Sequence, residues 1–193
     1  MDVRLWLFRN RSYMPIPFLL VMLVFAQPTF ESMVIGFVLA LVGEVIRFWG
    51  VSFVGSETRT TGEAGASQLV TVGPYAYVRN PLYIGNILIY IGFGVMSNAW
   101  FPWLTVIAAV YFVFQYSMII SLEEEVLRRK FGERYEAYTQ KVPRFFPRIR
   151  RDVLVVNSSH QFNLRRGFAS ERRTLQAFVL VSFVIFVLWL MRK

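Results

Sequence analysis

The sequence contains no cysteine and only one histidine, His160. The lack of cysteine excludes disulfides, thiolate zinc sites and cysteine nucleophiles. A single histidine also excludes metal sites built from several histidines, so we predict that the protein uses no metal ion. Charged residues are scarce too, at 17% of the chain, whereas soluble domains carry about 25%. A shortage of charge on this scale disfavours a soluble fold.

Apolar residues are correspondingly abundant. They make up 55% of the 193 residues, and the mean hydropathy is +0.46, which excludes intrinsic disorder. Five stretches approach the roughly 20 apolar residues that a membrane helix needs. They cover residues 13–30, 33–55, 82–98, 100–122 and 174–191. We therefore predict an all-α, multi-pass transmembrane helical bundle of about five spans, with cytoplasmic loops and short helices.

The basic residues are distributed as the topology of such a bundle requires. The net charge is +9, and lysines and arginines gather at the N-terminus, in 56–81 and above all in 122–173. The short connections at 28–32 and 97–101 carry none. The positive-inside rule places the basic segments in the cytoplasm, so the expected partner is the lipid bilayer rather than nucleic acid. Basic residues at the C-terminus run mildly against the rule, and a last segment that is re-entrant or interfacial stays an alternative.

The connection between the second and third stretches ends in the run Tyr-Ala-Tyr-Val-Arg-Asn-Pro-Leu-Tyr-Ile-Gly at 75–85. Asn80 is a favourable N-cap and Pro81 a favourable first helical residue, so a helix is predicted to begin here. A helix N-terminus binds anions, and Arg79 adds a charge suited to carboxylates. Tyr83 lies on the first turn and can face the same point. An ordinary cap with a snorkelling arginine and an interfacial tyrosine is the alternative.

The fourth apolar stretch runs directly into three consecutive carboxylates, Glu123 to Glu125. Negative charges at the C-terminal end of a helix are unfavourable and need partners. Gly132 predicts a helix break, followed by a short amphipathic helix with Tyr135 and Tyr138 on one face. A Pro-bounded extended stretch follows at 142–147. The alternative is a solvated charged helix on a basic membrane surface.

The two segments occur in the order G-P-Y-x-Y-V-R-N-P-x-Y-x-G, a helical hairpin, then E-E-x-x-L-x-x-x-F-G-x-x-Y-x-x-Y-x-x-x-V-P-R-x-x-P. Over about 34–148, this double motif resembles the isoprenylcysteine carboxyl methyltransferase and phospholipid methyltransferase superfamily of integral membrane enzymes. The resemblance implies an S-adenosylmethionine site at the cytoplasmic face. The implied cofactor-binding residues are Tyr77, Val78, Arg79, Asn80, Tyr83, Glu123 and Glu124. The residues expected to border the acceptor are Arg47, Tyr135, Tyr138 and Arg144, with Glu123 and Arg144 as the catalytic candidates.

One departure from the motif affects the expected chemistry. The carboxyl methyltransferases have histidine where this chain has Asn80, and asparagine does not titrate near neutral pH. We therefore expect cofactor binding but no proton transfer at this position. The predicted reaction is methyl transfer to a lipophilic or lipidated acceptor, with carboxyl O-methylation of the isoprenylcysteine type favoured. Phospholipid or amine N-methylation is the first alternative, and an NADPH-dependent enzyme similar to sterol reductases is the second.

The chain is predicted to divide at residue 148. Residues 1–148 would form the membrane methyltransferase domain, and 149–193 a basic interfacial segment followed by a C-terminal hydrophobic helix. His160 is expected to be a surface residue. Glu44 and Arg47 lie three apart in the second stretch, where intramembrane charges commonly serve function. They form either a wall of the acceptor pocket or a simple i, i+3 ion pair. The oligomeric state is not indicated.

Overall fold

The computed structural model describes residues 2–55, 68–148 and 161–192, and in these ranges the regular structure is entirely helical. The elements are α1 (Val3–Asn10), α2 (Pro15–Val24), α3 (Phe30–Val54), the 3₁₀ helix η2 (Gly73–Ala76), α4 (Pro81–Ser97), α5 (Trp103–Phe131), α6 (Glu133–Lys141) and α7 (Leu164–Met191). This confirms the predicted all-α class. Residues 56–67 of the predicted connection 56–81, and His160, lie outside the described residues.

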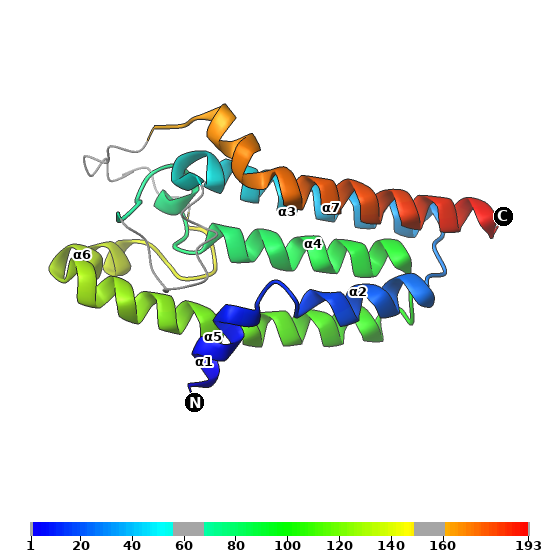
Figure 1. Cartoon of the computed structure of the whole chain (residues 1–193), viewed down its shortest axis with the longest axis horizontal. Helices are drawn as coiled ribbons and strands as arrows, with labels where there is room; N and C mark the ends of the chain where they lie inside the picture. The colour runs from blue at the N-terminus through cyan, green and yellow to red at the C-terminus, as the bar shows by residue number, and fades with distance from the viewer. Residues whose placement is uncertain (1, 56–67, 149–160, 193) are drawn as a thin grey trace.

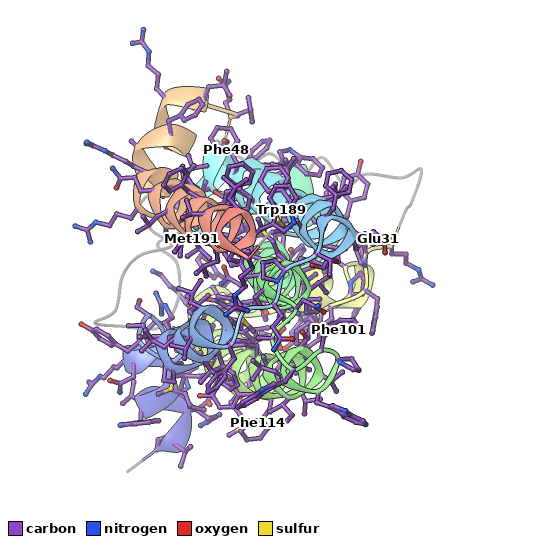
Figure 2. The ribbon with its side chains drawn as sticks, turned by 90° about the vertical axis from the view of Figure 1, so that its right-hand side faces the viewer. Glu31, Phe48, Phe101, Phe114, Trp189 and Met191 are labelled. Atoms are coloured by element: carbon purple, nitrogen blue, oxygen red, sulfur yellow. The ribbon has the colours of Figure 1, made fainter. Side chains whose placement is uncertain are left out.

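Helix α4 occupies the centre of the bundle. It contacts α3 and α7 on one side and α2 and α5 on the other. Figure 1 shows these helices running nearly parallel to the long axis, and Figure 2, viewed from the end that carries Glu31 and Met191, shows α4 between the two pairs. The outer helices expose large apolar side chains such as Val110, Phe114, Leu180 and Phe183. A surface of this kind suits lipid, because lipid tails solvate apolar groups that water does not.

Three of the five apolar helices are long and apolar enough to cross a membrane, namely α3, α5 and α7. The central helix α4 has 17 residues and α2 only ten. At 1.5 Å per residue, α2 is about 15 Å long, roughly half of the hydrocarbon thickness. It is shorter than the predicted stretch 13–30: Pro15 opens the helix, and the helix ends at Val24, four residues before Pro28.

Helices α3 and α4 pack through glycines that bring their backbones into contact. A Cβ atom at Gly43 would lie 2.6 Å from the carbonyl oxygen of Gly85, and one at Gly92 would lie 2.5 Å from the backbone nitrogen of Ala40. Such small residues allow close helix approach in membranes. The glycine pair around Phe93 therefore serves helix packing: Gly92 faces α3, and Gly94 faces Thr105 of α5.

The end of α3, the start of α4, the end of α5 and the start of α7 all lie at one end of the bundle, on the left in Figure 1. This arrangement brings the two halves of the double motif to the same end. Helix α7 begins at Leu164, ten residues before the predicted stretch, and Asn163 caps it by accepting a hydrogen bond from the backbone nitrogen of Arg166. Residues 164–173 of the predicted basic interfacial segment thus form the first part of the last helix, whereas residues 149–160 are outside the described ranges.

Candidate functional site

The two halves of the double motif are joined by hydrogen bonds between their backbones. The backbone nitrogen of Arg79 donates to the carbonyl oxygen of Pro143 at 2.9 Å, and that of Arg148 donates to Tyr77 at 3.1 Å. The Asn80 side chain adds a third link, from its Nδ2 to the carbonyl oxygen of Arg144 at 3.2 Å. Segments more than 60 residues apart in the sequence therefore form one unit beside the start of α4.

Asn80 is the N-cap residue of α4 and Pro81 its first residue, as predicted, but the Asn80 side chain makes no capping hydrogen bond. Its amide instead donates to the segment after α6. The expectation of a side-chain cap is therefore wrong, because the returning 143–148 segment offers a carbonyl that the isolated sequence does not reveal. Asn80 thus connects the motif halves.

Glu124 is the centre of the charged groups at this end of the bundle. Its side chain is almost completely buried, at 4% exposure, and it forms ion pairs with Arg79 at 3.4 Å and with the Nη2 atom of Arg144. The Nε atom of Arg144 lies 3.2 Å from both carboxylate oxygens. The hydrogen bond to Glu124 raises the pKa of Arg144, so the guanidinium remains charged. One carboxylate therefore balances two arginines.

Glu123, the preceding residue, has different surroundings. It accepts a hydrogen bond from the Tyr83 hydroxyl at 2.8 Å, and the Tyr83 ring packs 4.8 Å from the ring of Tyr116. Glu125 points away and pairs with Arg4 at 3.1 Å and with Arg129. The helical register of α5 therefore separates Glu123 and Glu124 from Glu125. We call Arg79, Tyr83, Glu123, Glu124 and Arg144 the motif cluster.

The remaining residues predicted around the cofactor lie close to this cluster but differ in exposure. Val78 is buried at 4% exposure, so its side chain belongs to the core. Tyr77 is half-buried, with its ring 6.1 Å from that of Trp49. Contacts of these two residues with a cofactor stay predictions.

Tyr135 and Tyr138 share one face of α6, as the spacing predicts, but that face packs against the protein. They form a small core with Val142, against which Leu69, Leu127 and Phe131 pack. The Tyr138 hydroxyl donates to the carbonyl oxygen of Tyr75 at 2.7 Å. Burial raises the pKa of Tyr135 to about 12 and that of Tyr138 further, so both hydroxyls stay protonated at neutral pH. Their contact with an acceptor stays a prediction.

Arg47 lies in a second group of charges, away from Glu124. Its Nη2 atom is 2.6 Å from a carboxylate oxygen of Glu171 on α7, and its Nη1 atom donates to Asn86 on α4. Among the described residues no ion pair joins Arg47 to Glu44, so the simple i, i+3 pair does not form. We call Glu44, Arg47, Asn86 and Glu171 the seam cluster, because it lies where α3 meets α4 and α7.

Sequence reasoning missed Glu171 and Asn86. Glu171 lies beyond the double motif, in a segment interpreted as a basic membrane surface, yet its side chain is completely buried. The available signal was one acidic residue in an arginine-rich segment just before a long apolar stretch. Asn86 gave a similar signal, as a polar residue inside an apolar helix, where such residues need hydrogen-bond partners.

Comparison with known proteins places the double motif in a family. The sequence model of the family described as phospholipid methyltransferase matches residues 32–134, more than half of the chain. No solved structure matches the chain significantly, and the described residues contain no group of three or more His, Cys, Asp or Glu that could hold a metal ion.

Two curated relatives share 33% identity over 115 residues, which is 60% of this chain. They are the nickel-cobalt-cadmium resistance protein NccN of Alcaligenes xylosoxydans xylosoxydans and the cobalt-zinc-cadmium resistance protein CzcN of Cupriavidus metallidurans. The match covers 48% and 47% of their lengths, so the chain spans about half of each relative. The family match covers α3, α4, α5 and the double motif up to the start of α6, and on this basis the chain belongs to the phospholipid methyltransferase family.

Proposed function

We propose that the protein transfers the methyl group of S-adenosylmethionine to a lipophilic acceptor at the motif cluster. The observation that carries this proposal is the unequal pairing of two adjacent carboxylates. Glu124 is balanced by Arg79 and Arg144, whereas among the described residues Glu123 accepts a hydrogen bond from the uncharged Tyr83 hydroxyl and forms no ion pair, and the charge of Arg11 acts on it without one. Glu123 is therefore the acidic group with capacity for a further positive charge.

S-adenosylmethionine carries two positive charges, on the ammonium and the sulfonium, and one carboxylate. In this proposal Glu123 receives one of the cations, since charge-assisted hydrogen bonds to a carboxylate are strong. Arg79 and the first turn of α4 attract the carboxylate. Glu124 holds the two arginines in place and does not contact the cofactor. This refines the prediction that both carboxylates bind it.

The reaction is an in-line displacement, accelerated mainly by positioning and by exclusion of water. We propose a carboxylate acceptor of the isoprenylcysteine type, because a carboxylate is ionised at neutral pH and needs no base. Arg144, whose side chain is 38% exposed, would orient the acceptor carboxylate. An amine acceptor such as a phospholipid headgroup is the alternative, and it would need Glu123 to take up its proton.

Equilibrium binding to the purified protein in detergent tests the cofactor assignment. Wild type should bind S-adenosylmethionine, and Glu123→Gln should weaken binding more than tenfold, or about 1.4 kcal/mol. Glu125→Gln is the matched control and should change it less than twofold, since Glu125 pairs with Arg4 and Arg129 on another face. Equal losses in both variants would contradict the assignment. Tight binding of NADPH without S-adenosylmethionine binding would favour the reductase alternative.

We propose further that the motif cluster faces the cytoplasm. Because the chain has no cysteine, single cysteines report topology without background. Phe146, which is 87% exposed near the motif cluster, and Trp103, which is 73% exposed at the opposite end, are suitable positions. A membrane-impermeant thiol reagent should label Phe146→Cys only from the cytoplasmic side and Trp103→Cys only from the other side. Labelling of both from one side would contradict a spanning bundle.

A further inference from the structure

The seam cluster contains a carboxylate, that of Glu44, with no hydrogen-bond partner or ion pair among the described residues. Glu44 lies in the membrane-spanning helix α3 and is only 4% exposed. Within residues 2–55, 68–148 and 161–192, neither of its carboxylate oxygens has a hydrogen-bond partner. A buried ionised carboxylate is strongly unfavourable unless it is paired, and the penalty is larger inside a membrane. Some positive charge must therefore neutralise Glu44 in the folded protein.

Arg47 is the nearest candidate, but both of its terminal nitrogens are already engaged, and its buried Nε atom has no hydrogen-bond partner among the described residues. Its two terminal nitrogens donate to Glu171 and Asn86. Its aliphatic chain passes close to Gly85, where an added Cβ atom would lie 2.5 Å from the Arg47 Cγ atom. The side chain is therefore held between α3 and α4. Glu171 and Arg47 are the charged groups that act electrostatically on Glu44, and Arg47 forms no ion pair with it.

The packing around Glu44 restricts what else can supply the charge. Both carboxylate oxygens are buried, and the neighbouring Gly43 is in backbone contact with α4, since a Cβ there would lie 2.6 Å from the Gly85 oxygen and 2.9 Å from the Ile89 nitrogen. A metal ion or an organic ammonium needs a cavity with several ligands. A proton needs none, because it binds directly to a carboxylate oxygen.

We propose that Glu44 is a proton-binding site within the helical bundle, and that the proton keeps Arg47 available to Glu171. When Glu44 is neutral, it does not compete with Glu171 for Arg47. The ion pair between Arg47 and Glu171 then holds α7 against α3. Further contacts support that seam: the Ser170 hydroxyl donates to the Gly55 carbonyl oxygen at 3.1 Å, and Phe168 packs edge-on against Phe48. Loss of the proton would make Glu44 a second acceptor for Arg47. The proposal is independent of methyl transfer.

Infrared spectroscopy tests this directly, because a protonated carboxyl has a carbonyl band separate from those of carboxylates and amides. Spectra are taken of the full chain in detergent at pH 7. The Glu44→Gln variant, a neutral near-isostere, should lose the band area of one carboxyl relative to wild type. Glu31→Gln is the matched control, since Glu31 is exposed near the opposite end of α3, and it should leave the band unchanged.

Two further variants test whether the protonation of Glu44 depends on the ion pair between Arg47 and Glu171. Glu171→Gln should also lose the band, because Arg47 would then be free to pair with Glu44 and ionise it. Arg47→Gln should keep or enlarge the band, because Glu44 would have lost its nearest cation and Glu171 its ion-pair partner. Thermal unfolding in detergent confirms that each variant is folded, and the Glu44→Gln and Glu171→Gln pair suffices if Arg47→Gln does not fold.

An unchanged band in Glu44→Gln would overturn the proposal, since Glu44 would then be ionised and neutralised by something other than a proton. A band that persists in Glu171→Gln would overturn the coupling to Arg47. Neither result would depend on whether S-adenosylmethionine binds. Failure of the proposed methyltransferase would leave the infrared result unaffected.

Discussion

The motif cluster and the seam cluster are built from the same residue types, yet their charges are balanced in opposite ways. In the motif cluster two arginines converge on Glu124. In the seam cluster Arg47 pairs with Glu171 and leaves Glu44 without a hydrogen bond. The motif cluster lies partly on loops at the end of the bundle, and the seam cluster lies on three helices.

This difference shows that the residue type and burial of an acidic side chain do not by themselves determine its role. A buried carboxylate with an excess of cations acts as an anchor, and its removal leaves buried positive charge behind. A buried carboxyl group without a neighbouring cation is either protonated, and so neutral, or it binds a cation.

The same substitution in the two clusters should have very different effects on stability. Glu124→Gln leaves Arg79 and Arg144 without their shared counter-charge and should reduce the free energy of unfolding by about 3 kcal/mol, near the low end for a broken buried pair because Arg144 is 38% exposed. Glu44→Gln breaks no hydrogen bond among the described residues and exchanges one neutral, unpartnered polar group for another of similar shape, so it should change it by about 1 kcal/mol or less. Denaturation in detergent measures both, and similar losses would refute the contrast.

Backbone packing beside the seam cluster should tolerate no added methyl group. Gly43→Ala places a Cβ against the Gly85 backbone and should cost about 1–3 kcal/mol. Gly50 on the same helix is the matched control, because its nearest neighbour is the end of the flexible Leu82 side chain. Gly50→Ala should therefore be nearly neutral in the same unfolding measurement. A neutral Gly43→Ala would mean that the helices are farther apart.

One hydroxyl should contribute to the attachment of α6 to the 3₁₀ helix η2. Tyr138→Phe removes the hydrogen bond to the Tyr75 carbonyl oxygen and should reduce the free energy of unfolding by about 1 kcal/mol. Tyr13→Phe is the control, because Tyr13 is 68% exposed and should change little. Thermal unfolding compares the two variants, and equal midpoints would mean that water replaces the lost partner.

High pH should slightly lower the free energy of unfolding through Tyr135 on α6. Burial raises the pKa of Tyr135 to about 12 from its ordinary value of 10. The unfolded chain therefore releases this proton before the folded chain does, so the contribution of Tyr135 to stability is complete below pH 10 and is lost as the pH rises through 12. Stability measured between pH 9 and 12 should fall less steeply in Tyr135→Phe than in wild type. Identical slopes would show that Tyr135 is hydrated.

The regular elements were largely predictable from the sequence. Long apolar stretches give the positions of α3, α4, α5 and α7, because such stretches form helices that are buried or face lipid. Pro81 marks the start of α4 and Gly132 the end of α5 by their backbone chemistry. The first apolar stretch was harder, because its prolines divide it. Helix α2 consequently has only ten residues.

The candidate site was predictable only in part. Its double motif names Arg79, Tyr83, Glu123, Glu124 and Arg144, and the structure brings all five together. The sequence could not indicate that Glu124 pairs with both arginines, whereas Glu123 contacts a tyrosine. That division depends on the rotation of α5 about its axis, which the packing of α4 and the returning 143–148 segment determines.

The sequence by itself determined the class of the protein: a helical membrane bundle carrying the motifs of a methyltransferase family. It did so because apolar length, proline and glycine positions and motif order are local properties. Only the tertiary structure decided which charges meet. Glu171 reaches Arg47 across 124 residues of chain, and Arg144 reaches Glu124 across 20. Electrostatic pairing depends on distance in space, and neither separation is encoded in a local pattern.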